Sequence, residues 1–563
     1  MKRGPLVAVA TALALVVASQ LFPRSVPLGV VLLGALLGTG TGLMAVGLVL
    51  TYRTTRIINF SYGAMGSTAA GVTAGLVLGR DVPWALAAPF GVLVGVGIGA
   101  GVERFVIRRF ATAPRLVLTV ATIGLAQARG GAAVFLPTLL DTQPIISSLD
   151  TPLTDRRLDV DPVLFNGNDL ALLAVVPVVL AALGWFLMKT EAGIAVRGMA
   201  DNMDRARLLG IPVNRLSMLL WSVAGGLAAL TVIMRLPNEG ISFDVAAGPN
   251  VLLPALAAAV VTGMTSLWGA FVAGMAIGVL DQLVRWNVER QATTYLVLLA
   301  VIVIGLLVQR SIGPKARAGS EESSWSVVGA GRSLPAALAR LPEVRLARVV
   351  GLAAVAALVV LVPFVGSTSQ VNYATVTLVY AMVAISLVVL TGWGGVVSLG
   401  QIAIVGVGGV VAANLIADRN MDLWLTLGAS AVAGGLVALL LGLPALRVSG
   451  QLLAVTTLAF AAAMQLYFLN PANYESLLPS SYSRPELWGR AELVDERWLY
   501  ALTLGLLVAS VVVIRNMRRA RTGRVIAAAR DNDRAAAATG INTVETRLMA
   551  FVFAGCFAGL AGA

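Results

Sequence analysis

Two glycine-rich interruptions of otherwise apolar sequence carry the side chains best suited to contact a polar molecule. These side chains are amides and hydroxyls, and they belong to Asn59, Ser61, Tyr62, Ser398 and Gln401. Neutral polar groups beside unwound backbone could contact a zwitterion that passes through the protein. The alternative is structural, because polar side chains also satisfy neighbouring helices and glycine permits close packing. Contact with a passing solute is therefore one hypothesis for these residues, and helix packing is the other.

The residues that most enzymatic chemistry requires are absent or isolated. The chain has no histidine, which excludes histidine bases, metal ligands and proton relays. Its one cysteine, Cys556, stands in an apolar run and is interpreted as a small core residue. No G-x-x-x-x-G-K-S/T phosphate loop occurs, so ATP, if used, must be hydrolysed by another chain. We expect no catalytic residue, no metal and no cofactor bound by this chain.

Composition predicts the elements that position the polar groups. Of 563 residues, 58% are hydrophobic and 12% are charged, with a mean hydropathy of +0.87, which is far too apolar for a soluble fold. The apolar residues come in blocks of about 17 to 23, the length of a helix that crosses roughly 30 Å of hydrocarbon. Lipid offers no partner to the backbone, so each block must be helical. The sequence predicts an all-α, polytopic transmembrane bundle in a cell (inner or plasma) membrane.

Basic residues set the predicted orientation of the first half, residues 1–310. The net charge of +13 lies in short loops between spans, which is the positive-inside pattern rather than a nucleic-acid surface. With a cytoplasmic N-terminus, the three basic loops that contain Arg53, Arg104 and Lys189 fall inside, and the acidic loop 139–169 falls outside. Residues 7–22 also resemble a signal peptide, although no clear cleavage site ends them. The predicted spans are 6–22, 28–50, 61–78, 84–102, 115–138, 170–188, 216–234, 251–263, 267–283 and 293–309, of which 251–263 and 267–283 could be broken or re-entrant.

A polar, small-residue segment, 311–347, divides the chain and is predicted to be a cytoplasmic linker. The second half, 348–563, has predicted spans at 348–366, 374–391, 396–416, 423–443, 452–469 and 498–514. Elsewhere, the four-residue spacing of Gly91, Gly95 and Gly99 predicts a close helix contact. Glu103 and Asp281 lie at span ends and are interpreted as interface charges.

The two large inside loops repeat each other without gaps. GIAVRGMADNMDRARLLGI from Gly193 aligns with GRVIAAARDNDRAAAATGI from Gly523, which indicates a duplicated domain. Each loop predicts a short helix, with Asp201 or Asp531 as its N-cap and Gly210 or Gly540 as the left-handed residue that ends it. Such helices would be docking sites for another protein. Alternatively, the two segments are ordinary basic loops that anchor the protein at the inner face of the membrane. The residues that recur are Asp201, Asn202, Ala206 and Gly210, and Asp531, Asn532, Ala536 and Gly540.

Several of these segments resemble a known family. LTYRTTRIINFSYGAMG, from Leu50, and GMADNMDRARLLGIPVNR resemble the H-type (LivH-like) permease of branched-chain amino-acid ABC importers. LTGWGGVVSLGQIAIVGVGG, from Leu390, LRVSGQLLAVTTLAF and RDNDRAAAATGINTVETRLMAF resemble the M-type (LivM-like) partner. The resemblance implies that an H-type half, 1–310, and an M-type half, 348–563, are fused in one chain, with the M-type half incomplete at its C-terminus.

The resemblance also implies a mechanism and partners. In such importers the permease halves enclose the solute path, the inside helices dock on two ATPase subunits, and an external binding protein delivers the solute. The loops around Asp201 to Gly210 and Asp531 to Gly540 would then couple ATP hydrolysis, on the partner subunits, to rocking of the membrane halves. Family members often have histidine near the two interruptions, where this chain has Tyr62 and Gln401, so no imidazole acts there.

Two other classes of function compete with this interpretation. A secondary transporter driven by an ion gradient also commonly has repeats. Against it, the sequence has no convincing cluster of intramembrane acidic residues to bind protons or sodium, and the paired inside loops would have no purpose in it. A membrane-embedded transferase needs a carboxylate or metal constellation. The aspartates of the loop 139–169 show no ligand spacing.

Overall fold

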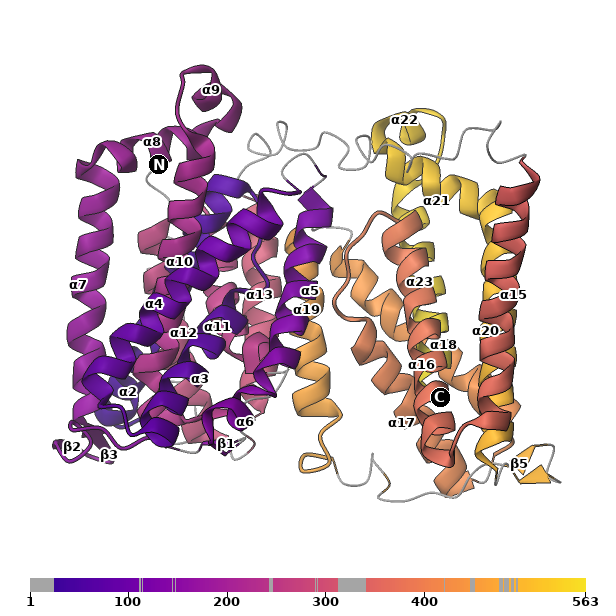
Figure 1. Cartoon of the computed structure of the whole chain (residues 1–563), viewed down its shortest axis with the longest axis horizontal. Helices are drawn as coiled ribbons and strands as arrows, with labels where there is room; N and C mark the ends of the chain where they lie inside the picture. The colour runs from indigo at the N-terminus through magenta and orange to yellow at the C-terminus, as the bar shows by residue number, and fades with distance from the viewer. Residues whose placement is uncertain are drawn as a thin grey trace. The chain divides into compact units, whose positions relative to one another are not determined.

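The computed structural model describes residues 25–563 apart from 111–112, 114, 144, 147, 243–246, 289, 291, 312–340, 420, 446–450, 475–478, 480–485, 488–490 and 493–494. The described chain is almost entirely helical, which confirms the predicted fold class (Figure 1). Ten described helices are long and apolar enough to cross a membrane. The predicted first span, 6–22, and most of the predicted linker lie outside the described residues.

The chain divides into two compact units, Met1–Ala316 and Arg317–Ala563. Unit 1 contains α2 Leu28–Thr55, α3 Tyr62–Arg80, α4 Trp84–Val102 with a π-turn Glu103–Ile107, α5 Arg115–Ala133, α6 Leu136–Leu140, α7 Gly167–Lys189, α8 Glu191–Asp201, α9 Met203–Leu208, α10 Val213–Glu239, α11 Ala247–Val261, α12 Leu267–Asn287 and α13 Thr293–Ser311. Its strands form two short antiparallel pairs, β1 Ile145–Ile146 with β4 Ile241–Ser242, and β2 Arg157–Val160 with β3 Val163–Asn166.

Unit 2 repeats the first part of this order. It contains α15 Pro342–Val365, α16 Thr368–Leu387 with a π-segment Val388–Trp393, α17 Gln401–Arg419, α18 Leu423–Ala445, α19 Gln451–Ala463 with a π-segment Met464–Phe468, α20 Glu496–Arg519, α21 Arg521–Asp531, α22 Asp533–Ala538 and α23 Thr543–Gly562. Strands β5 Glu486–Leu487 and β6 Ala491–Glu492 pair antiparallel. Residues 342–347, which the sequence places in the linker, begin α15.

Three predicted spans have different ends or forms from those expected. The span 396–416 is wrong at its start, because residues 396–400 are not helical and α17 begins at Gln401. The span 115–138 is two helices, since α5 ends at Ala133 and the short α6 follows. The segment 267–283 belongs to α12, which at 21 residues is long enough to cross a membrane and need not be broken.

Glycines allow the central helices of each unit to touch. Gly91, Gly95 and Gly99 are buried on one face of α4, and a Cβ at any of them would overlap atoms of α3 or α10, which confirms the predicted close contact. In unit 1, Gly95 meets Gly225; in unit 2, Gly434 of α18 meets Gly555 of α23 in the same way. Both units are therefore built around the same glycine-mediated helix pair.

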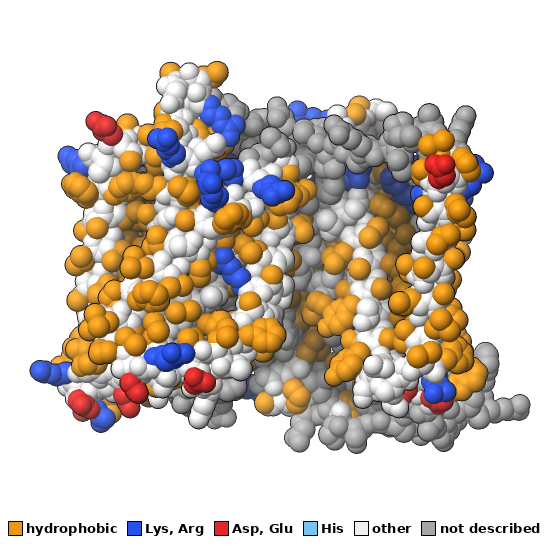
Figure 2. Space-filling model, in the orientation of Figure 1, with side chains coloured by type: hydrophobic (Ala, Val, Ile, Leu, Met, Phe, Trp, Pro, Cys, Tyr) orange, Lys and Arg blue, Asp and Glu red, His pale blue; other side chains and the backbone are white. Residues whose placement is uncertain are grey.

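The two ends of unit 1 differ in charge and in structure. At one end, Arg56 donates to the carbonyl of Ala200 and Arg108 donates to that of Asn214, each at 3.1 Å, so the predicted inside loops do meet. Figure 1 shows α8 and α9 at this end of α7 and the β2–β3 hairpin at the other. Figure 2 shows basic side chains near α8 and α9 and apolar side chains over the helices between the ends. Glu103 pairs with Arg108 at 3.0 Å, and Asp281 pairs with Arg285 at 3.0 Å.

Candidate functional site

Unit 1 contains a buried break between α2 and α3. Helix α2 ends at Thr55, Arg56 adopts a left-handed conformation with φ of 55°, and α3 begins only at Tyr62. The Asn59 amide oxygen accepts from the Ser61 backbone N–H at 3.0 Å and from its hydroxyl at 2.7 Å. Both side chains are 0% exposed. Asn59 and Ser61 therefore hold the turn itself, because their polar atoms satisfy each other.

A threonine from a neighbouring helix holds this break. The Phe60 N–H donates to the Thr122 hydroxyl of α5 at 3.3 Å, and that hydroxyl lies 2.8 Å from the carbonyl of Thr119, which can accept from it. Phe60 and Thr122 are both buried. A backbone N–H that is free of helix hydrogen bonds thus finds a partner inside an apolar bundle.

Unit 2 contains the same break, at the second glycine-rich interruption. The π-segment ends at Trp393, Gly395 has a φ of 68°, and α17 begins at Gln401. The Leu399 N–H donates to the Thr457 hydroxyl of α19 at 2.9 Å, and the Thr457 hydroxyl donates to the carbonyl of Ala454 at 3.0 Å. Ser398 accepts from the Gly400 N–H at 3.2 Å, so this side chain also serves the turn.

Tyr62 and Gln401 occupy equivalent places in the two units, each as the first residue of the helix after the break. Tyr62 is 0% exposed and Gln401 is 3% exposed. The Tyr62 hydroxyl and both polar atoms of the Gln401 amide are buried without a hydrogen-bond partner among the described residues. Buried polar atoms in native structures are normally bonded, so these two side chains call for an explanation. The Tyr62 hydroxyl lies against Gly47 of α2, where a Cβ would overlap it.

The predicted inside helices are helix–turn–helix elbows rather than single helices. Helices α8 and α9 form one elbow, and α21 and α22 form the other. Asp201 and Asp531 were predicted as N-caps, and this is wrong: each is the exposed last residue of the preceding helix. The caps are Asn202 and Asn532, whose side chains accept from the backbone N–H groups of Arg205 and Ala535 at 3.0 Å.

Both elbows end as predicted. Gly210 and Gly540 have φ values of 79° and 82°, in the left-handed region that favours glycine. The N–H groups of Ile211 and Ile541 reach back to the carbonyls of Ala206 and Ala536, each at 3.1 Å. Ala206 and Ala536 are buried beneath the elbow, whereas the residues around them are exposed. The four repeated positions thus have matching conformations in the two units.

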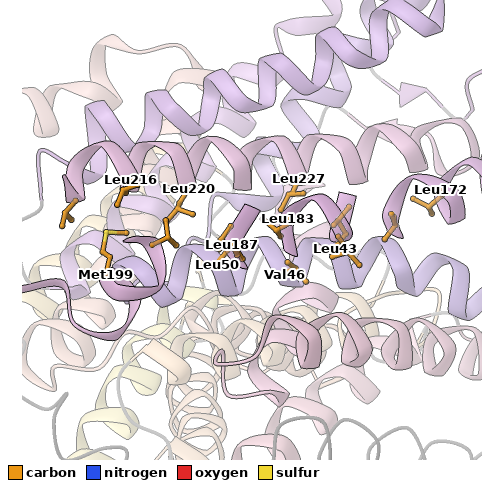
Figure 3. Close-up of a cluster of buried hydrophobic side chains, with 14 of the residues drawn as sticks. Leu43, Val46, Leu50, Leu172, Leu183, Leu187, Met199, Leu216, Leu220 and Leu227 are labelled. Carbon is orange, nitrogen blue, oxygen red and sulfur yellow. The ribbon is translucent and has the colours of Figure 1, made fainter. Parts of the chain in front are cut away.

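Each elbow packs against the body of its unit and is hydrogen-bonded to the helix end that precedes a break. In unit 1, Val196 and Met199 of α8 join a buried cluster with Leu50 of α2 and with residues of α7 and α10 (Figure 3). Ile526 and Ala529 of α21 are buried at the equivalent places. Arg56, at the end of α2, donates to the carbonyl of Ala200 in α8 at 3.1 Å.

Unit 2 has the corresponding hydrogen bond, but its donor lies on the elbow rather than at the helix end before the break. We call these two arginine hydrogen bonds the ties. Arg530 of α21 stands where unit 1 has Ala200, and it donates to the carbonyl of Gly392 at the end of the π-segment at 2.6 Å. Each elbow is therefore hydrogen-bonded to the helix end directly before a break.

The comparisons with known proteins agree with this internal repetition. The family described as branched-chain amino acid transport system / permease component matches residues 30–307 and again 369–563. The chain belongs to this family. It is a multi-pass membrane protein with two permease halves, and relatives named LivH and LivM each match part of it.

The individual relatives are distant. The LivH permease protein of the Salmonella typhimurium high-affinity branched-chain amino acid transport system is 26% identical over 270 residues, covering 44% of this chain and 83% of that protein. LivM of the same organism is 28% identical over 228 residues, covering 36% of this chain and 53% of LivM. BraD of Pseudomonas aeruginosa is 26% identical over 261 residues, covering 44% of this chain and 83% of BraD. The chain thus spans about half the length of the LivM relative that it matches.

The sequence missed several residues that the structure brings to the site. Thr122 and Thr457 are ordinary threonines in apolar helices, and only alignment of the two halves could have paired them. Arg56 and Arg530 were counted as loop charges, although their carbonyl partners are far away in sequence.

Proposed function

We propose that this chain is the membrane-spanning permease of an ABC importer that translocates branched-chain amino acids or a related small solute. One observation carries the proposal: in both halves, an elbow is hydrogen-bonded to the helix end that precedes a break. Family membership supports it, because the relatives are named as permease proteins of branched-chain amino acid transport. The chain's own role is transport rather than catalysis.

The solute path is proposed to run beside the two breaks. Tyr62 and Gln401 are the best candidates for solute contact, since their buried polar atoms lack partners among the described residues. Asn59, Ser61 and Ser398 have a different role in this scheme: their hydrogen bonds preserve the break. If Gln401→Ala leaves uptake unchanged at normal membrane abundance, Gln401 does not contribute to the path.

The elbows are proposed to dock on two ATPase subunits at the cytoplasmic face. Their exposed residues, from Asp201 to Gly210 and from Asp531 to Gly540, would meet the partners, while the buried alanines fix each elbow to its unit. Closure of the ATPases around ATP would push both elbows. The ties at Ala200 and Gly392 would carry this motion to the breaks and switch the path between inward and outward states.

The remaining partners and the orientation follow from the same proposal. An external binding protein delivers the solute, ATP is bound only by the partner subunits, and this chain needs no cofactor. The N-terminus and the elbows lie on the cytoplasmic side of the cell (inner or plasma) membrane, in accord with the basic residues at that end of unit 1.

Co-purification from native membranes in mild detergent tests the proposal. ATPase subunits should be recovered with the chain, and ATP hydrolysis should be stimulated by the loaded binding protein. Gly210→Val and Gly540→Val, which strain the elbow backbone, should weaken recovery or stimulation. A chain that purifies without any ATPase and transports in response to an ion gradient would overturn the proposal and identify a secondary transporter.

A further inference from the structure

Arg129 is a fixed positive charge in a helix of the membrane bundle. It lies in α5, which packs against α3 and contacts α11. Its side chain is half-buried, and its Nη1 atom is shielded from solvent with no hydrogen-bond partner among the described residues. The guanidinium group stays charged in proteins, so burial cannot neutralise it. A charge at membrane depth normally has a partner or a function.

The helical repeat places Arg129 on the α5 face that holds the unit 1 break. Leu118, Thr122, Ala126 and Gly130 are buried on this face, whereas Val120, Gly124 and Gln127 are exposed. Arg129 follows Thr122 by almost two turns, which is about 10 Å along the helix axis. It therefore lies beside the proposed path, between the break and the end of unit 1 that carries the β2–β3 hairpin.

Arg129 has neither an ion-pair partner among the described salt bridges of unit 1 nor an equivalent charge in unit 2. The described acidic side chains of unit 1 that form salt bridges are Glu103, Glu239 and Asp281, and each pairs with an arginine other than Arg129. In unit 2, the segment 451–468 that corresponds to α5 contains no lysine or arginine. Among the described residues, Arg129 of α5 therefore has no equivalent positive charge in the corresponding segment of unit 2.

We propose that Arg129 binds the carboxylate of the solute as it passes through the membrane. The proposal rests on the transport function proposed above and specifies the solute as a small carboxylic acid, such as an α-amino acid. A guanidinium presents two parallel N–H donors that match a carboxylate. Arg129 lies about 10 Å along the axis of α5 from Thr122, which bonds the break, so it would hold the carboxylate on the hairpin side of the break.

Transport of L-leucine tests the role of the charge. The chain is reconstituted in vesicles with its ATPase subunits and binding protein. Arg129→Gln should lower ATP-driven leucine uptake at least tenfold, and Arg129→Lys should retain an intermediate rate. Equal uptake by the wild type and Arg129→Gln would overturn the proposal, whereas a wild type that imports nothing with ATP would overturn the importer function instead.

Cysteine chemistry tests the site by its accessibility to reagents as well as by uptake. In a Cys556→Ser background, Arg129→Cys should react with water-soluble methanethiosulfonate reagents, and leucine should slow the reaction. The matched control Gln127→Cys, on the exposed face of α5, should not be protected. A reagent that attaches an ammonium group should restore uptake, and one that attaches a sulfonate should not. An unreactive Arg129→Cys, or equal recovery with both reagents, would overturn the proposal.

The phosphate of an anionic lipid could bind Arg129 in place of the solute carboxylate. Uptake is therefore compared in vesicles of phosphatidylcholine alone and in vesicles that also contain phosphatidylglycerol. A solute site predicts the same loss for Arg129→Gln in both. A loss confined to vesicles with phosphatidylglycerol would assign Arg129 to a lipid phosphate and overturn the proposal.

Discussion

The backbone N–H of Leu399, in the break before α17, donates to the hydroxyl of Thr457 in α19 at 2.9 Å. Phe60 and Thr122 form the same bond in unit 1, at 3.3 Å. In an apolar bundle, a broken helix survives only when the freed backbone groups find partners within the protein. The hydrogen bond from the break backbone to a threonine hydroxyl therefore stabilises the break in both halves.

Removing the threonine hydroxyl should destabilise the break without leaving a large cavity. Thr457→Val keeps the shape of the side chain but leaves the Leu399 N–H unpaired, at a cost of about 1–3 kcal/mol. We expect a lower thermal unfolding temperature of the purified protein in detergent, and reduced uptake. Thr122→Val should act in the same direction.

The neighbouring Thr456 provides the matched control for this change. Among the described residues, its hydroxyl bonds only the carbonyl of Leu452, within its own helix, at 3.1 Å. Thr456→Val should therefore shift the unfolding temperature less than Thr457→Val does. Equal shifts would show that the bond to Leu399 contributes nothing specific.

Gly47 and Tyr62 should be coupled energetically. Gly47→Ala places a methyl group where the Tyr62 hydroxyl lies, so this variant should lose stability through overpacking, by roughly 1–3 kcal/mol. Tyr62→Phe removes the overlapping oxygen and should partly rescue Gly47→Ala. Unfolding temperatures of the two single variants and the double variant measure the coupling, and strictly additive effects would contradict the contact.

The variant Tyr62→Phe distinguishes a packing role for Tyr62 from a role in solute contact. Its hydroxyl has no hydrogen-bond partner among the described residues, so Tyr62→Phe alone should leave stability nearly unchanged. If the hydroxyl contacts the solute, uptake should nevertheless fall. Unchanged uptake would leave Tyr62 with a packing role only.

Much of this arrangement was predictable because the two halves repeat one another. The aligned loops predicted one short inside helix in each half, where the structure has a two-helix elbow, and Gly210 and Gly540 have the left-handed conformation expected of them. The cap was misplaced by one residue because Asp201 and Asn202 are both good caps. The choice depends on where α8 ends, and tertiary contacts at Val196 and Met199 determine that.

Other features could not be read from local pattern. Val396 and Val397 are apolar, so the span predicted from hydropathy ran straight across the break before Gln401. The ties from Arg56 to Ala200 and from Arg530 to Gly392 join distant segments, and no periodicity reports them. The predicted boundaries at 310 and 348 and the solute-path roles remain predictions.

The arginine ties should affect coupling more than folding. Arg56→Gln and Arg530→Gln shorten the side chains so that they no longer reach the carbonyls of Ala200 and Gly392. With both ties removed, ATP hydrolysis by the partner subunits should continue while solute uptake per ATP falls several-fold. Arg197→Gln, on the exposed face of α8, is the matched control and should keep the normal ratio. A double variant with a normal ratio of uptake to hydrolysis would exclude the ties from transmission.

The left-handed glycines should be required for backbone reasons alone. A Cβ at Gly210 or Gly540 would meet no atom within 4 Å, so a substitution there causes strain without a clash. Gly540→Ala should cost about 1 kcal/mol, because an L-residue is disfavoured in the left-handed region. Gly198→Ala is the opposite control: it lies within α8, where its Cβ would meet only Ile211 at 3.9 Å, and alanine favours the helix. Hydrogen exchange of the elbow amides should accelerate in Gly540→Ala and slow in Gly198→Ala. If both variants shift exchange in the same direction, conformational strain does not explain the two glycines.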